Sequence, residues 1–102
     1  MRFRRIYWVT EQFDDNGFSE VTGVYTSVPN LLESGLGVKD YSSKKAGFKL
    51  SLCELDNESP PLFTVSSPNF DGLREHLAPL MDSGELTHDE VSRLLSAIEL
   101  HK

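Results

Sequence analysis

An Asn-Gly pair, Asn16-Gly17, separates two stretches of the chain that are rich in aromatic and β-branched residues, 3–13 and 18–26. Asn-Gly is the strongest short signal for a β-hairpin, because both residues accept the positive φ that a type I′ turn requires. The sequence therefore predicts that the chain begins with two antiparallel strands, and this hairpin limits the folds that the rest of the chain can adopt.

The length of the turn sets the register of this hairpin. A two-residue turn pairs Trp8 with Tyr25, Val9 with Val24 and Glu11 with Thr22. A four-residue loop would instead place Glu11 opposite Glu20, and like charges directly opposite one another are unfavourable. We therefore predict the two-residue turn.

A second hairpin and three helices follow. Phe48, Leu50 and Leu52 alternate with Lys49, Ser51 and Cys53, which predicts a strand with one apolar face, and 62–66 read as the returning strand. A short helix is predicted to start at Ser27 and stop at Gly35, and a second to open at 67–69 and to kink or end near Pro79. The last helix starts at a capping box formed by Thr87 and Glu90.

This order of elements, ββα-ββα-α, predicts an α+β fold in one domain, residues 1–102: a four-stranded antiparallel sheet with helices packed on one face. Short stretches before the first two helices echo each other, TSVPNL at 26–31 and VSSPNF at 65–70. The strand residues expected to face the helices are Tyr7, Val9, Val24, Phe48, Leu50, Leu52, Phe63 and Val65. Those expected to pack against them from the helices are Leu31, Phe70, Leu73, Leu77, Leu94 and Ile98.

The composition is that of a globular domain and does not predict a membrane-spanning segment. The chain has 102 residues, a net charge of −6 and a hydrophobic fraction of 38%, which is typical of an acidic globular domain. The longest apolar run, Ile6 to Val9, is too short to span a membrane. The single cysteine, Cys53, excludes an internal disulfide and favours the reducing cytoplasm.

The residues that most often carry catalysis lack the spacing that catalysis needs. Cys53 lies in a predicted strand, where a cysteine is usually a small packed residue, and no nucleophile turn precedes it. His76, His88 and Asp89 lack the close spacing of a metal site. No glycine-rich phosphate loop is present. We therefore expect no enzymatic activity, no cofactor and no metal.

The first strand suggests a binding surface. If Tyr7 and Val9 face the helices, Ile6 and Trp8 point to the other face, where Tyr25 joins them. Ile6, Trp8 and Tyr25, rimmed by Arg4 and Lys49, would then form an exposed patch of the kind that marks an interaction site. This predicts a protein-interaction module that binds a protein partner or a second copy of itself.

Two alternatives remain open. The terminal helix or residues 37–47 could cover the patch, which would place Trp8 in the core. The protein could also bind a small molecule or single-stranded nucleic acid through the basic and aromatic N-terminal strand and the loop at 39–49. Nucleic acid is the less favoured partner, because the acidic C-terminal half repels polyanions.

Overall fold

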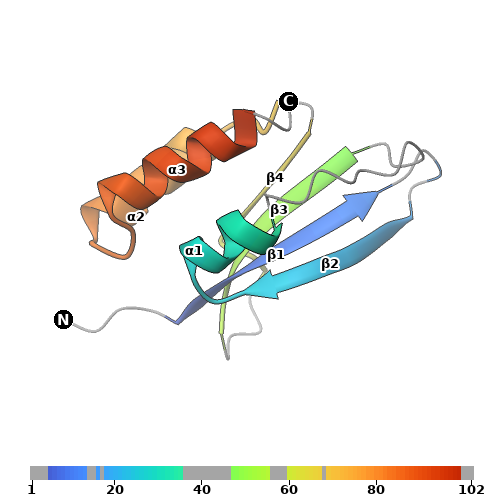
Figure 1. Ribbon diagram of the computed structural model, residues 1–102, viewed down its shortest axis with the longest axis horizontal. Helices are drawn as coiled ribbons and strands as arrows, with labels where there is room; N and C mark the ends of the chain where they lie inside the picture. Colours follow the sequence, from blue (N-terminus) through green and yellow to red (C-terminus); the bar gives the residue numbers. More distant parts are fainter. Residues whose placement is uncertain are drawn as a thin grey trace.

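The computed structural model describes residues 5–13, 16, 18–35, 47–55, 60–67 and 69–99. It shows an α+β fold with a four-stranded antiparallel sheet, as predicted (Figure 1). The strands are β1 (Ile6–Phe13), β2 (Ser19–Tyr25), β3 (Gly47–Glu54) and β4 (Phe63–Ser66), in the order β2-β1-β3-β4. The helical elements are α1 (Val28–Asn30), a π-helical turn η1 (Leu31–Gly35), α2 (Leu73–Asp82) and α3 (His88–Glu99).

The two hairpins meet at the centre of the sheet. β1 pairs with β3 over its whole length, from Ile6 opposite Glu54 to Phe13 opposite Gly47. The partners β2 and β4 therefore form the two edges. α2 and α3 lie side by side, and α1 and η1 contact α3, so the helical elements form one layer (Figure 1).

The predicted register of the first hairpin is confirmed only at one end. Trp8 pairs with Tyr25 and Val9 with Val24, but Glu11 pairs with Val21 because a β-bulge interrupts the ladder. Thr22 is the extra residue of the bulge, and its hydroxyl lies 2.9 Å from the Thr10 hydroxyl. A bulge shifts the pairing beyond it by one residue, so a turn length alone does not give the register. Asn16 lies in a turn, and Gly17, the second residue of the predicted turn, lies outside the described residues.

The core lies between the sheet and the helical layer. Trp8 lies within it, with only 1% of its surface exposed, and packs edge-on against Phe63 with ring centroids 6.1 Å apart. The predicted core residues of the helices are all buried: Leu31, Phe70, Leu73, Leu77, Leu94 and Ile98. So are the predicted residues of the second hairpin: Phe48, Leu50, Leu52, Phe63 and Val65.

The predicted orientation of the first hairpin is wrong. Tyr7, Val9 and Val24 lie on the face away from the helices, while Trp8 and Thr10 point into the core. Both sets of side chains on β1 are largely apolar, and burying the large Trp8 side chain removes more apolar surface from water than burying Val9. Thr10 is tolerated in the core because its hydroxyl has a partner in Thr22.

The first helix begins as predicted, and the second does not. Ser27 caps α1, its side chain accepting a hydrogen bond from the backbone N–H of Asn30. α2 begins only at Leu73, after Phe70 and Gly72 have taken positive φ values of 52° and 83°. The chain therefore turns before the helix starts.

The prediction for Pro79 was that it kinks or ends the second helix; α2 does not end there but continues through Pro79 to Asp82. A proline inside a helix leaves the carbonyl of the residue four positions earlier without its usual donor, and here that residue is Glu75. Pro79 and Glu75 are both exposed, so water can reach this carbonyl.

None of the helices in the described part of the chain combines the length and the apolar character that crossing a membrane requires.

α3 begins at the predicted capping box. The Glu90 N–H donates to the Thr87 hydroxyl at 3.1 Å, and the Thr87 N–H donates to the Glu90 carboxylate at 2.9 Å. Each side chain thereby satisfies a backbone donor that the helix leaves free. Both hydrogen bonds of the predicted capping box are therefore present.

We expect Thr87→Ala to lower the free energy of unfolding by about 1 kcal/mol, because the Glu90 N–H loses its acceptor. Urea denaturation followed by circular dichroism measures the change. Ser92→Ala, at an exposed position within α3, is the control and should change stability by less than about 0.5 kcal/mol. Equal effects of the two substitutions would show that the cap does not stabilise α3.

Candidate functional site

The sheet has a second face that no helix of the described residues covers, and we call it the open face. It consists of Tyr7, Val9, Glu11 and Phe13 of β1, Ser19, Val21 and Val24 of β2, Lys49, Ser51 and Cys53 of β3, and Thr64 and Ser66 of β4. The strand pairings place these side chains together, because side chains alternate between the two faces of a sheet. The open face is thus assembled from all four strands.

The half of the open face that belongs to β1 and β2 is mostly apolar, and Glu11 and Ser19 are its polar residues. Val21 and Val24 are 55% and 58% exposed, and Tyr7, Val9 and Phe13 are half-buried beside them. We call these five residues the apolar band. A sheet face in water usually carries polar side chains, so the apolar band is the candidate binding site on this face.

The half that belongs to β3 and β4 is polar. The hydroxyls of Ser51 and Thr64 lie 2.9 Å apart and hydrogen-bond across the two strands. Lys49 marks the border between the halves, with its Nζ atom 5.8 Å from the centre of the Phe13 ring. That distance permits a cation–π interaction, so Phe13 joins the apolar band to the polar half.

Tyr7 and Cys53 form a pair on the open face. They are direct neighbours in the β1–β3 ladder. Negative charge on Cys53 and a hydrogen bond between the two side chains raise the pKa of the Tyr7 hydroxyl above its ordinary value of 10.0. A tyrosine hydroxyl is uncharged at neutral pH at its ordinary pKa, and the rise at Tyr7 is in the same direction, so this position adds no charge to the band.

The structure does not assemble the patch that the sequence predicted. Trp8 is buried in the core, and Ile6 and Tyr25 pack against that core on the same side of the sheet. Trp8 is therefore unavailable to a partner. It lies in the core because the first hairpin faces the other way, and residues 37–46, one of the two segments expected to cover it, lie outside the described residues. Of the two predicted rim residues, Lys49 lies on the open face and Arg4 lies outside the described residues.

The residues that sequence reasoning missed are those of the apolar band. Their signal was present: Tyr7, Val9 and Phe13 form an alternating apolar set on β1, as do Ile6 and Trp8. The alternation shows that the two sets face opposite ways, but both sets are apolar, so it does not indicate which of them is buried.

The candidate catalytic pair is not brought together. Cys53 lies on the open face, whereas His76 of α2 stacks on the Phe63 ring at 4.8 Å, on the helical side. The sheet therefore separates the thiol from this imidazole. Within the described ranges, no cluster of three or more His, Cys, Asp or Glu side chains is arranged to hold a metal ion.

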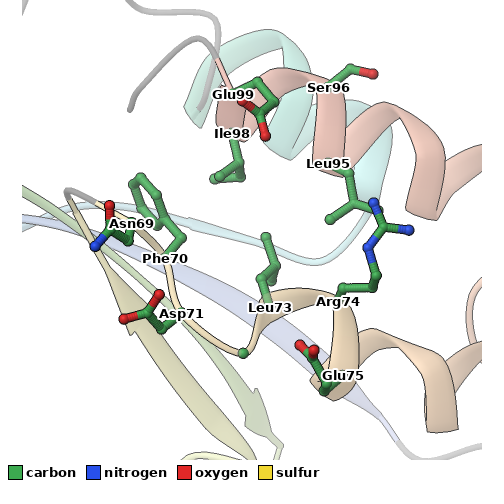
Figure 2. Close-up of a pocket in the computed structure, with 11 residues that line it drawn as sticks. Asn69, Phe70, Asp71, Leu73, Arg74, Glu75, Leu95, Ser96, Ile98 and Glu99 are labelled. Atoms are coloured by element: carbon green, nitrogen blue, oxygen red, sulfur yellow. The ribbon is translucent and has the colours of Figure 1, made fainter.

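A cleft of about 380 Å³ lies on the helical side, between the start of α2 and the end of α3 (Figure 2). Its floor is formed by Phe70, Leu73 and Ile98, which are already buried in the core. Its rim carries charges of both signs, among them Arg74 and Glu75. The cleft is thus a gap at the end of the helix pair, with little apolar surface left for a ligand to cover.

Comparisons with protein families, with curated proteins and with solved structures found no match for this chain.

Proposed function

We propose that this protein is a non-enzymatic interaction domain that binds a protein partner through the open face of its sheet. The observation that carries the proposal is the apolar band, and above all the exposure of Val21 and Val24. Both valines lie on a strand at the sheet edge, where Val24 pairs with Val9 of the neighbouring strand and Val21 pairs with Glu11. A partner that covers the band would remove apolar surface from water, which is the main favourable term in protein association.

The band also has the anatomy of an interface. Aromatic side chains, which interfaces favour, lie at Tyr7 and Phe13, and a hydrogen-bonding polar half borders them.

We place the protein in the cytoplasm as part of the proposal, because a single half-exposed thiol, Cys53, suits a reducing compartment. Binding of single-stranded nucleic acid is not favoured, since Trp8 is buried and cannot stack on a base.

A charge placed within the band tests the proposal. We expect Val24→Lys to abolish capture of partner proteins from an extract of the native host, because taking the charge of a lysine out of water beneath a partner costs several kcal/mol. Val24 points away from the core, so the variant should keep its fold. Quantitative mass spectrometry of the captured proteins, including untagged copies of this chain, measures the effect.

The matched control is Ser92→Lys, which adds the same charge at an exposed position of α3. This variant should capture the same proteins as the unaltered chain. If both variants capture the same set, the open face is not the binding site and the proposal is wrong.

A further inference from the structure

We propose that Asn16 is a site of spontaneous covalent modification, at which the side-chain amide is lost as ammonia. Asn16 stands directly before Gly17, in the segment that joins the two strands of the first hairpin. Asparagine is among the chemically labile residues of proteins, and a following glycine exposes its amide to attack by the backbone. The proposal does not depend on the proposed function, because it concerns the turn and not the open face.

The reaction takes place within the chain and needs only water as a second reactant. The backbone nitrogen of Gly17 loses its proton and attacks the side-chain carbonyl carbon of Asn16. A bond forms between these two atoms, the bond from that carbon to the amide nitrogen breaks, and ammonia leaves with the proton. The product is a succinimide ring. Water then opens the ring at either of its two carbonyls, which gives aspartate or isoaspartate.

The surroundings of Asn16 favour this reaction. A glycine has no Cβ, so no side chain crowds the nitrogen that attacks. Asn16 lies in a turn and is exposed, so water can reach its side chain. The last pair of the β1–β2 ladder is Phe13 with Ser19, and Asn16 lies beyond that pair. The regular hydrogen bonding of the sheet therefore ends before the reacting residue.

The two other asparagines that the structure describes are held differently. Asn30 precedes Leu31, whose backbone N–H donates to a backbone carbonyl at 3.1 Å. Asn69 precedes Phe70, whose backbone N–H donates to a backbone carbonyl at 2.9 Å. At both positions the nitrogen that would attack is already a hydrogen-bond donor, and it belongs to a residue with a large, buried side chain. The comparison therefore favours Asn16 as the residue that reacts.

Deamidation changes both the charge and the backbone of the hairpin connection. The neutral amide becomes a carboxylate, which adds one negative charge to a net charge of −6, directly after Asp14 and Asp15 in the sequence. In isoaspartate the main chain also runs through the former side chain, which lengthens it by one carbon atom. We therefore expect the modification to weaken the pairing of Phe13 with Ser19, the end of the ladder next to this connection.

Ageing of the purified full chain at body temperature tests the proposal, with peptide mapping by mass spectrometry as the measurement. We expect the peptide that contains Asn16 to be converted into an aspartyl and an isoaspartyl form, with one ammonia released per chain. Conversion should be faster at mildly alkaline than at neutral pH, because the attacking nitrogen must lose its proton. The peptides that contain Asn30 and Asn69 should remain unchanged. Equal conversion at either of them would overturn the assignment to Asn16.

Asn16→Gln is the matched control, because it keeps a neutral amide at the same exposed position. Its extra methylene would require a larger ring, which closes more slowly. The variant should therefore release no ammonia over the same time, and circular dichroism should show that it is folded. If Asn16→Gln releases ammonia as fast as the unaltered chain, the reaction takes place elsewhere and the proposal is wrong.

A parallel sample in urea separates the effect of the fold from that of the local sequence. We expect Asn16 to react in the native chain as well as in the unfolded one. If Asn16 reacts in urea but stays intact in the native chain over the same time, the fold protects it and the proposal is overturned. An Asn16 that stays intact in both samples overturns it as well.

Discussion

Replacing Trp8 by alanine is expected to lower the free energy of unfolding by about 3–5 kcal/mol, the range for removing a buried aromatic side chain. Trp8 is 1% exposed, lies against the Phe63 ring and is next to Leu52 in the sheet. A small domain has a total stability of about 5–15 kcal/mol, so this loss is a large share of the whole. Urea denaturation followed by far-ultraviolet circular dichroism measures it.

Val24→Ala is the control for Trp8→Ala, because Val24 belongs to the adjacent strand but points to the open face. Its effect on the monomer should be less than about 1 kcal/mol. Trp8 is also the only tryptophan, so its fluorescence should shift to longer wavelength when the protein unfolds. If the two substitutions cost the same, or if the fluorescence does not shift, Trp8 is not in the core.

Replacing Leu94 by alanine is expected to lower the free energy of unfolding by about 2–5 kcal/mol. Leu94 is fully buried in the middle of α3, the helix that contacts both α2 and the α1–η1 segment. The cavity left by the substitution would therefore lie where the parts of the helical layer meet. The same denaturation experiment measures the loss.

Leu95→Ala is the matched control for Leu94→Ala, since it removes the same atoms from the next, half-buried residue of α3. It should cost clearly less than Leu94→Ala. A harmless Leu94→Ala would mean that α3 does not dock on the core, and that the capping box and apolar stripe only stabilise an isolated helix.

The features that were predicted correctly depend on short stretches of chain. The Ser27 cap, the capping box of Thr87 and Glu90, and the alternation of Phe48, Leu50 and Leu52 each depend on a few neighbouring residues. Local hydrogen bonds and side-chain periodicity determine such features, so the sequence alone is sufficient to find them.

The orientation of β1 and the candidate site depend instead on contacts between distant residues. Strand periodicity shows that Trp8 and Val9 face opposite ways, but it does not show which of them meets the helices. That choice follows from Phe63, more than fifty residues away, whose ring packs against Trp8. The apolar band was missed for the same reason: once Trp8 faces the helices, the residues of β1 that alternate with it lie on the open face.

The β-bulge at Thr22 could not be predicted from the length of the turn either. It depends on the hydroxyl of Thr10, which points into the core and has Thr22 as its partner. A polar group in a core needs a partner, and the extra residue in β2 supplies one. The register beyond the bulge therefore depends on a buried hydroxyl that an analysis of loop length does not consider.

The pairing of β1 with β3 has a consequence for how the protein folds. Each hairpin joins neighbours in the chain, but the central ladder joins residues more than thirty positions apart, and the Trp8–Phe63 contact spans a still longer loop. An isolated two-stranded hairpin is at best marginally stable in water, so neither half can persist before the other arrives. Folding is therefore a cooperative, all-or-none event, whose rate is limited by the entropy of closing these long loops rather than by the fast local steps of turn and helix formation.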